Sequence, residues 1–424
     1  MDQSSETSES TSTASFFDRP GVQVESLPIG QGVPLGIESV SNADLGLGGA
    51  YGAWGACFDN ASLPEVIQGR LGLPLDHGVL NLSELGFAFR HHVPDLTEEQ
   101  HVELEVEVGA RILSEAIRAN GWAPAEVDAV LIGITVPAAP DYVERIARRA
   151  GVPEHALKVT IHKACDGSVA GLNLALNPDL HMGEGVTGNL AQTLMGKKVL
   201  VGGIEGLSRV MWHTQDRQAL QLFGNGAGII GLIPGETMQF LAGESQEVYD
   251  EDGVLQVRMA YPHSGRRAAG QSLIEVAQTG LHSLRFAGLM HEPDDKADAV
   301  VMAGPMGMVK LFVRSGVSTV RSAYAAYRNR MAQLSMPGKD IAVAFVHHAN
   351  YKINQLKAKQ LEKEGIRIPM PWLLSEFGNV SAASTMIAFL RKLKALKPGD
   401  HVLFDGFGAG TYYDVVAVEL GRRS

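Results

Sequence analysis

The chain has 424 residues, 45% of them hydrophobic and 20% charged, which is an ordinary composition for a globular protein of one large or two smaller domains. Its formal net charge of −11 argues against nucleic acid as the main partner, because contact with phosphates needs a basic surface. Two cysteines cannot form a disulfide framework, and no stretch reaches the roughly 18 apolar residues of a membrane span, so we expect a cytoplasmic protein.

The N-terminal stretch "MDQSSETSESTSTAS" is rich in Ser, Thr and Glu. Such a segment cannot bury enough apolar surface to fold, so residues 1–17 are predicted to be a disordered tail. The stretch also lacks the basic start and apolar core of a signal peptide. Beyond it, short apolar runs alternate with helical patterns, which indicates a layered α/β fold.

Helices are predicted over residues 97–120, ending before a glycine, and 315–334, ending before a Pro-Gly pair. Six continuous apolar runs are typical of strands that are covered on both faces. These runs are residues 129–135, 158–161, 198–202, 341–346, 401–404 and 414–419.

The order of the elements repeats along the chain. The first half has a long helix followed by "EVDAVLIGIT", "HKACDGSVAGLNLAL" and "MGKKVLVGGIEG", and the second has a long helix followed by "DIAVAFVHHAN", "SEFGNVSAASTMIAFL" and "KPGDHVLFDGFGAG". We therefore predict two pseudo-symmetric halves, residues 18–240 and 241–424, with residues 177–193 as an insertion in the first. Superposing the two strand-to-helix elbows places Cys165 opposite Asn379.

Cys165 lies where a predicted strand meets a predicted helix. The helix dipole and the unpaired N–H groups of a helix start favour the thiolate form of a cysteine. A lone cysteine in a cytosolic protein is more often a buried structural residue, but the elbow and the flanking small residues favour a nucleophile here. Cys57, in "GACFDN", has no such setting and is predicted to be a core or loop residue.

A nucleophilic cysteine needs a base or an oxyanion stabiliser from elsewhere in the fold. The motif "FVHHAN" places His347 and His348 at a strand end, and neighbours on a strand point to opposite faces, so at most one is catalytic. "FGNVSAAS" supplies Asn379 as a neutral donor. The glycines of "FDGFGAGTYY" either bring backbone N–H groups close to a reacting carbonyl or simply form a tight turn.

The motifs "HHANYKI", "FGNVSAAS", "LKPGD" and "GFGAG", together with the Cys165 elbow and "LFGNGAG", resemble those of β-ketoacyl-acyl-carrier-protein synthase III enzymes of the thiolase superfamily. The resemblance covers residues 85–424 and implies a thiolase-like αβαβα architecture of two pseudo-symmetric halves. It implies that Cys165 accepts the acyl group and that His347 and Asn379 stabilise the enolate left by decarboxylation. The backbone N–H groups of Cys165 and Ala409 would form the oxyanion hole.

The activity that this resemblance implies is decarboxylative Claisen condensation of an acyl-Cys165 intermediate with a malonyl thioester. It further implies no bound cofactor, coenzyme A or phosphopantetheine thioesters as substrates, acyl-CoA or an acyl carrier protein as partner, and a homodimer. Gly408 is assigned to substrate binding. The aromatic residue that gates the family's acyl pocket aligns with Ala139, and Tyr142 is a candidate to replace it.

The stretch "YKINQLKAKQLEKEG" has helical spacing, which places Lys352, Lys359 and Lys363 on one face. A solvated charged face is the ordinary interpretation of such a run. Because Lys352 matches a basic position of the family and the helix starts beside His347, we predict that Lys352 and Lys359 steer an anionic thioester or carrier to the site.

The sequence bears on five other classes of function. "GAGIIG" matches the dinucleotide fingerprint G-x-G-x-x-G but runs into "IIGLIPG", which predicts a strand and turn. Zinc spacing and a G-x-S-x-G elbow are both missing, so neither a metal site nor a serine hydrolase is predicted. The alternative that stays open is an acyltransferase that passes the acyl group to an oxygen, nitrogen or other carbon nucleophile, since the departures from the family, including Asn225 for Asp, surround the substrate. A scaffold protein would lack the cysteine.

Overall fold

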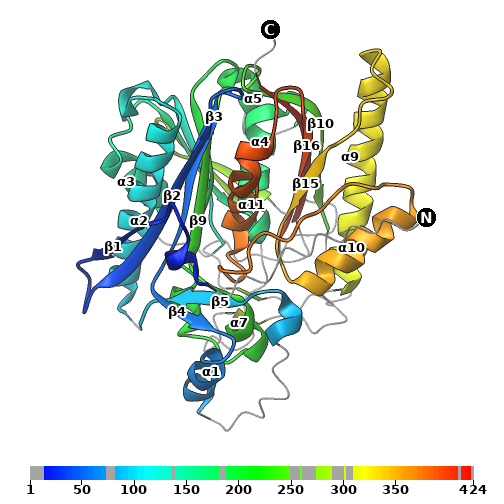
Figure 1. The fold of residues 1–424 in the computed structure, drawn as a ribbon. Coiled ribbons are helices and arrows are strands. Elements are labelled where there is room, and N and C mark those ends of the chain that lie inside the picture. The colour runs from blue at the N-terminus through cyan, green and yellow to red at the C-terminus, as the bar shows by residue number, and fades with distance from the viewer. Residues whose placement is uncertain are drawn as a thin grey trace.

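The computed structural model describes residues 14–72, 82–94, 96–135, 139–180, 188–248, 258–259, 274–288, 300–301, 309–408 and 412–421. Two β-sheets enclose a central helical layer, and further helices cover the outer face of each sheet (Figure 1). This arrangement confirms the predicted thiolase-like αβαβα architecture. No helix in the described ranges is long and apolar enough to cross a membrane.

The first sheet has the strand order β1-β2-β3-β9-β8-β6-β7-β13-β12 in the described chain. Its inner strands are fully buried because helices cover both of their faces. The strands are β1 (Gln23–Leu27), β2 (Val33–Asn42), β3 (Leu47–Trp54), β6 (Ala129–Gly133), β7 (Leu157–His162), β8 (Val199–Glu205), β9 (Gly226–Leu232), β12 (Ile274–Gly280) and β13 (Ser283–Gly288).

The second sheet has the order β10-β17-β16-β15. Two short strand pairs, β4 with β5 and β11 with β14, lie outside both sheets. The strands are β10 (Met238–Glu247), β15 (Val343–Val346), β16 (His401–Gly408), β17 (Tyr412–Leu420), β4 (Ala56–Asp59), β5 (Phe89–His92), β11 (Arg258–Met259) and β14 (Val300–Val301).

Both sheets contain the same run of pairings, as the sequence repeat predicted. In the first, β6 runs parallel to β8, and β8-β9 and β9-β3 are antiparallel. In the second, β15 runs parallel to β16, and β16-β17 and β17-β10 are antiparallel. The six predicted strands are β6, β7, β8, β15, β16 and β17. The "GAGIIG" segment lies in β9, which confirms its interpretation as a strand rather than a nucleotide-binding turn.

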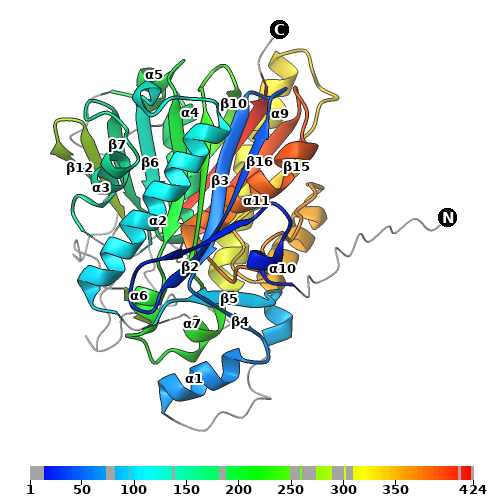
Figure 2. The same ribbon diagram turned by 60° about the vertical axis from the view of Figure 1, so that its left-hand side comes forward.

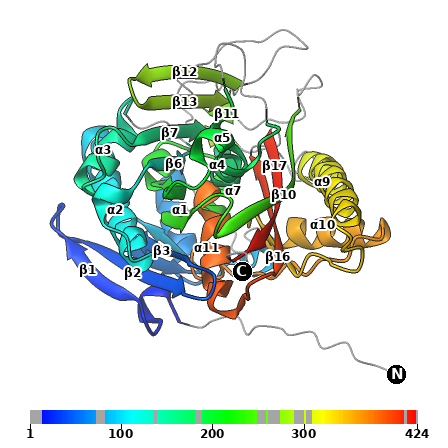
Figure 3. The same cartoon turned by 90° about the horizontal axis from the view of Figure 1, so that it is seen from above.

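The long helix α2 (Glu98–Ala119) begins at Thr97, whose side chain accepts a hydrogen bond from the Gln100 N–H. It lies across the outer face of the first sheet beside α3 (Tyr142–Arg149), whereas α9 (Arg314–Gln333) and α10 (Tyr351–Lys363) cover the second sheet (Figures 2 and 3). Both long helices match the predicted ranges within a residue. Short helices are α1 (Leu63–Leu71), α5 (Leu190–Leu194), α6 (Ser208–Met211) and α7 (Arg217–Leu222).

The central layer holds α4 (Gly167–Leu176) and α11 (Ser384–Lys392) between the two sheets. Every residue of α4 is buried, and small residues allow the close approach. A Cβ atom on Gly133, at the end of β6, would overlap the backbone of Gly167. These two helices matter for function because both sequence elbows lead into them.

The start of the ordered core differs from the prediction. Phe16, which falls within the predicted tail, is fully buried and packs against Phe377 with ring centroids 4.5 Å apart. The tail prediction is therefore wrong for residues 14–17, and residues 1–13 lie outside the described chain. Two consecutive phenylalanines at the end of a polar stretch were the signal that the composition argument overlooked.

Candidate active site

Cys165 lies at the predicted joint between strand and helix. After β7 ends at His162, the short 3₁₀ turn Ala164–Asp166 leads directly into α4, and Cys165 is half-buried in the middle of that turn. Ala164 has φ of 49°, in the left-handed region that a residue with a Cβ rarely adopts. Such local strain is typical of functional elbows.

The second half contains a matching elbow. Ser381 has φ of 44° and starts the 3₁₀ turn Ser381–Ala383, which leads into α11. Aligning the two left-handed residues places Cys165 opposite Ala382. The predicted equivalence of Cys165 and Asn379 is therefore wrong by three residues, because the sequence comparison matched the polar residues rather than the turn itself.

Asn379 is buried just before this second turn. Its Oδ1 accepts the Ser381 N–H at 2.9 Å, and its Nδ2 donates to the Ala349 carbonyl at 3.2 Å. Ala349 lies two residues after His347, so the amide of Asn379 ties the elbow to the histidine loop. The 3₁₀ turns of the two elbows also pack against each other. The structure thus gathers all three predicted catalytic residues where the halves meet.

His347 follows strand β15 and is buried, with its Nδ1 2.7 Å from the Ser384 hydroxyl and its ring against the edge of Phe407. Burial, together with the nearby His348 and Lys357, lowers the pKa of His347 to about 3. The imidazole is therefore neutral. When the Ser384 hydroxyl donates to Nδ1, the proton is on Nε2, which is then a hydrogen-bond donor.

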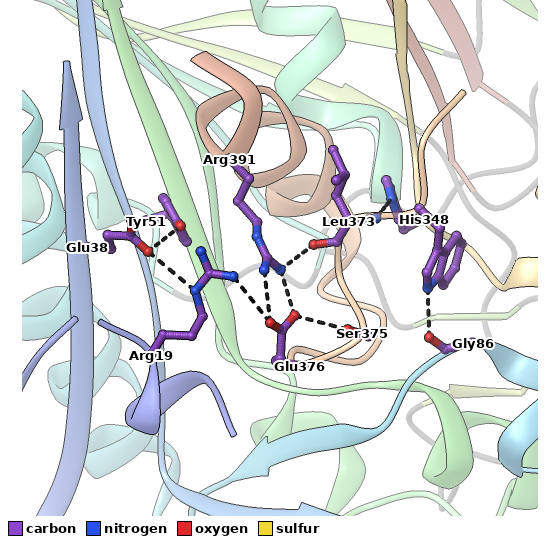
Figure 4. Close-up of polar contacts among 10 residues, drawn as sticks. Arg19, Glu38, Tyr51, Gly86, His348, Leu373, Ser375, Glu376 and Arg391 are labelled. Carbon is purple, nitrogen blue, oxygen red and sulfur yellow. Dashed lines mark hydrogen bonds and ion pairs between the residues drawn. The ribbon is translucent and has the colours of Figure 1, made fainter. Parts of the chain in front are cut away.

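His348 has a structural role. Its Nδ1 bonds the Val346 carbonyl at 2.8 Å. Its Nε2 accepts the Leu373 N–H at 2.9 Å, a contact that Figure 4 shows. Arg391 secures the same loop through two hydrogen bonds to Glu376, at 2.6 and 2.9 Å. Both ring nitrogens of His348 are thus occupied by backbone groups, and the catalytic role of His347 stays a prediction.

Gly408 lies directly against the Cys165 elbow. A Cβ atom there would overlap the Lys163 carbonyl oxygen and lie 3.1 Å from the Cys165 nitrogen. Only glycine therefore lets β16 approach the elbow this closely. Ala409, the other predicted member of the oxyanion hole, lies outside the described residues, so its role stays a prediction.

Sequence analysis missed a group of buried charges behind the elbow. Lys163 contacts Asp166 at 3.3 Å and also pairs with Asp414, and Lys357 pairs with Asp405 at 2.5 Å. A signal existed for Lys357, because it lies at helical spacing between Ile353 and Leu361 on the buried face of α10. The sequence prediction used only Lys352, Lys359 and Lys363, which lie on the exposed face of the helix.

The predicted basic face of α10 is exposed, as expected for a docking surface. Lys352, Lys359 and Lys363 are all exposed, and Leu356 adds an apolar side chain that is 43% exposed between the first two. Lys352 forms an ion pair with Glu84, so part of its charge is already compensated. No contact in the structure assigns the face to a carrier.

The residues predicted at the acyl pocket have different settings. Tyr142 is fully buried in the outer helical layer, where its hydroxyl lies 3.4 Å from Glu105. A side chain enclosed in this way cannot line a neighbouring subunit's pocket, so its predicted role is wrong. Ala139 is half-buried, and residues 136–138 lie outside the described chain.

Two further sequence departures have clear local explanations. Asn225 is buried, accepts the Ser208 N–H at 2.9 Å and donates to the Trp54 carbonyl at 3.2 Å, a pair of bonds that an aspartate could not make. Cys57 lies in β4, where burial and the carboxylates of Asp18 and Asp59 raise the pKa of its thiol to about 12. It is therefore no rival to Cys165 as a nucleophile.

Comparisons with known proteins find synthase III proteins. Residues 331–420 match the family described as 3-oxoacyl-[acyl-carrier-protein] synthase III C terminal. The chain is 24% identical over 341 residues to β-ketoacyl-[acyl-carrier-protein] synthase III 1 of Halalkalibacterium halodurans, covering 80% of this chain and 88% of that protein. It is 28% identical over 331 residues to synthase III 3 of Streptomyces coelicolor, covering 76% and 84%.

Solved structures share the fold. The 3-oxoacyl-[acyl-carrier-protein] synthase III of Aquifex aeolicus superposes with a TM-score of 0.59 at 18% identity, covering 94% of this chain and all of that one. A 1,3,6,8-tetrahydroxynaphthalene synthase of Streptomyces coelicolor gives 0.57 at 13% identity, covering 92% and 99%. The fold and the elbow thus define a protein with the thiolase-like architecture of condensing enzymes. In sequence the chain is similar to synthase III proteins, as its motifs predicted.

Proposed function

We propose that this protein is an acyltransferase that condenses acyl thioesters, with Cys165 as the acyl acceptor. The observation that carries the proposal is the meeting of the Cys165 elbow with two neutral donors, His347 and Asn379, on loops that hydrogen bond to one another. The synthase III names of the relatives favour condensation over transfer to an oxygen or nitrogen nucleophile.

The first step loads the enzyme. The Cys165 thiolate, favoured by its place at the start of the ten-residue helix α4, attacks the carbonyl of an acyl thioester. The new carbon–sulfur bond replaces the one to the carrier, whose thiol leaves with the proton. Backbone N–H groups of Cys165 and Ala409 hold the oxyanion in this proposal.

The second step forms the carbon–carbon bond. A malonyl thioester loses carbon dioxide, and the electron pair of the broken bond becomes an enolate whose oxygen accepts hydrogen bonds from His347 and Asn379. The enolate carbon attacks the acyl-Cys165 carbonyl, and the Cys165 sulfur leaves. Donors suit this step because a carboxylate at either position would repel the enolate.

The partners follow from the same chemistry. Coenzyme A and phosphopantetheine thioesters are anionic, and α10 offers Lys352 and Lys359 on its exposed face next to the histidine loop. We propose that an acyl carrier protein or acyl-CoA docks there.

A cytoplasmic homodimer completes the proposal. In the described chain β13 pairs with β7, so a dimer that forms by strand addition at that end of the first sheet would use β12.

Mass spectrometry of the protein after mixing with an acyl thioester tests the proposal. We expect one acyl group on the peptide that contains Cys165, and its loss with release of carbon dioxide when malonyl thioester is added. Cys57→Ser is the matched control and keeps full labelling. Acyl transfer to a hydroxyl or amine acceptor without carbon dioxide release would favour the alternative acyltransferase.

A further inference from the structure

Five ionisable side chains are buried behind the Cys165 elbow, and the reaction steps above use none of them. Each is at most 3% exposed. They come from four elements that meet there: the elbow itself, α10, β16 and β17. The group, called here the elbow cluster, consists of Lys163, Asp166, Lys357, Asp405 and Asp414.

Lys163 stands at the centre of the contacts. Its Nζ lies 3.3 Å from Asp166 Oδ2 and also pairs with Asp414. Asn173, on α4, donates to Asp414 Oδ1 at 2.6 Å. Asp414 therefore has the partners that an ionised carboxylate needs when it is buried.

Asp166 is in a different position. Its carboxyl hydrogen bonds that of Asp414, and within the described ranges the only donor that reaches it is the Lys163 ammonium, 3.3 Å from Oδ2, which it shares with Asp414. Two carboxyl groups can bond each other only if one carries a proton. Burial and the neighbouring Asp414 raise the pKa of Asp166 well above its usual range. Burial alone would also raise the pKa of Asp414, but Lys163, Asp166 and Asn173 hold it below its usual value.

The charge balance of the cluster depends on that proton. Lys163 and Asp414 cancel, and the Lys357–Asp405 pair sums to zero whether or not it exchanges a proton. An ionised Asp166 would therefore leave one buried negative charge on the residue next to Cys165. Such a charge would oppose formation of the thiolate, because like charges in a buried site raise a thiol pKa.

The strand that packs against Asp166 leaves space for its carboxyl group. A Cβ atom on Gly406, in β16, would overlap Asp166 Oδ1, so the strand has a glycine where the acid needs space. Other ionisable groups that act on the cluster are Glu244 and Glu247 of β10, Tyr413 of β17 and His347.

We propose that Asp166 is a positioning residue that works as a protonated acid: it ties the Cys165 elbow to β17 through Asp414 while placing no negative charge beside the thiolate. The proposal rests on the role of Cys165 as nucleophile. It predicts that the pKa of the Cys165 thiol stays the same when Asp166 cannot ionise. It also predicts that this pKa rises when Asp166 is forced to ionise.

The test is the pH dependence of Cys165 alkylation by iodoacetamide, followed on the Cys165 peptide by mass spectrometry. Asp166→Asn preserves size and a donor, so the midpoint stays at the wild-type pH. Asp414→Asn removes the carboxylate that balances Lys163, so Asp166 ionises in its place. The cluster stays neutral as a whole, but its negative charge moves from β17 to the residue next to Cys165. The midpoint then rises by about one pH unit, which is about a tenfold slower alkylation at neutral pH.

A midpoint that falls by about a unit in Asp166→Asn would overturn the proposal, because it would mean that a native carboxylate had been removed. Should Asp414→Asn fail to fold, infrared spectroscopy of the Asp166→Asn variant decides: the carbonyl stretch of a protonated carboxylic acid must disappear relative to wild type. A spectrum without that loss contradicts the proposal. Since alkylation needs no substrate, normal alkylation with failed acyl transfer would count against the proposed function instead.

Discussion

The two elbows of this protein have the same backbone conformation, but the strands that face them carry different residues. Each places a left-handed residue, Ala164 or Ser381, at the start of a 3₁₀ turn that feeds a buried central helix. The turn at Ala164 carries a thiol in its middle, and the equivalent residue of the other turn is Ala382. The two turns therefore share their backbone geometry and differ in the residue at their centre.

The strands facing the elbows explain the difference. Gly203 of β8 abuts the second elbow and Gly406 of β16 abuts the first, and in each case a Cβ atom would overlap the elbow. Two residues further along, β8 has Glu205, whose side-chain Oε1 accepts the Ala382 N–H at 3.0 Å. At the matching place β16 has Gly408, which brings no side chain to the Cys165 N–H. The second elbow is thus capped by a side chain of the facing strand, whereas the facing strand of the Cys165 elbow has a glycine at the matching place, where we propose that the oxyanion of the thioester binds.

The second elbow is flanked by residues that the proposed mechanism uses. Asn379 precedes it, and Ser384, the first residue of α11, bonds Nδ1 of His347. In the proposed mechanism the nucleophile therefore lies in one elbow, and the donors lie beside the other. Four predictions probe this division of labour.

Cys165→Ala has the largest expected effect, the complete loss of self-acylation. Because the residue is only half-buried in a turn, the fold should survive, and the thermal unfolding temperature should stay close to that of wild type. Labelling with an acyl thioester and mass spectrometry measure the effect. Acyl labelling that persists in this variant would refute the assignment of the nucleophile.

His347→Ala and Asn379→Ala should each slow condensation by about 10²–10³-fold, the usual cost of losing one preorganised donor. Acylation of Cys165 should remain, since neither side chain is used in that step. Rapid-quench measurement of both steps separates the effects. His348→Ala is the matched control: it should loosen the loop of Leu373, and if it alone stopped condensation, the choice of histidine would be wrong.

Glu205→Ala should lower the free energy of unfolding by about 1–3 kcal/mol, because it leaves the buried N–H groups of Thr135 and Ala382 without an acceptor. The rate of Cys165 acylation should change little, since Glu205 belongs to the capped elbow. Urea unfolding and acyl labelling provide the two readouts. Unchanged stability combined with lost acylation would reverse the roles given to the elbows.

Lys352→Glu with Lys359→Glu should raise the apparent Michaelis constant for a carrier-bound or coenzyme A-bound substrate by about tenfold and flatten its salt dependence. A small uncharged thioester should react as before. Steady-state kinetics at several salt concentrations measure this. An equal loss with both substrate types would show that these lysines support the fold and not docking.

Most of the helices and strands can be predicted from the sequence. Capping signals set both ends of α2, and continuous apolar runs marked six strands, because these patterns depend on local chemistry. The equivalence of Cys165 with Ala382 could not be predicted from the sequence. It depends on a positive φ at Ala164 and Ser381, and a positive φ is expected at glycine rather than at alanine or serine. Nor could the elbow cluster be predicted, because the burial of Asp166 depends on a glycine some 240 positions away in sequence, where β16 packs.

The central claim is that acyl-Cys165 is consumed by a decarboxylated malonyl unit that neutral His347 and Asn379 stabilise. The most direct measurement is the pH dependence of that single step in preloaded acyl-enzyme, following carbon dioxide release and loss of the acyl adduct together. With the pKa of His347 lowered to about 3 by burial, the imidazole stays neutral, so the rate should show no histidine titration between about pH 5 and 8. One carbon dioxide should appear for each acyl group lost. A rate that falls through a pKa near the ordinary histidine value of about 6.5, or acyl loss without carbon dioxide, would contradict the account.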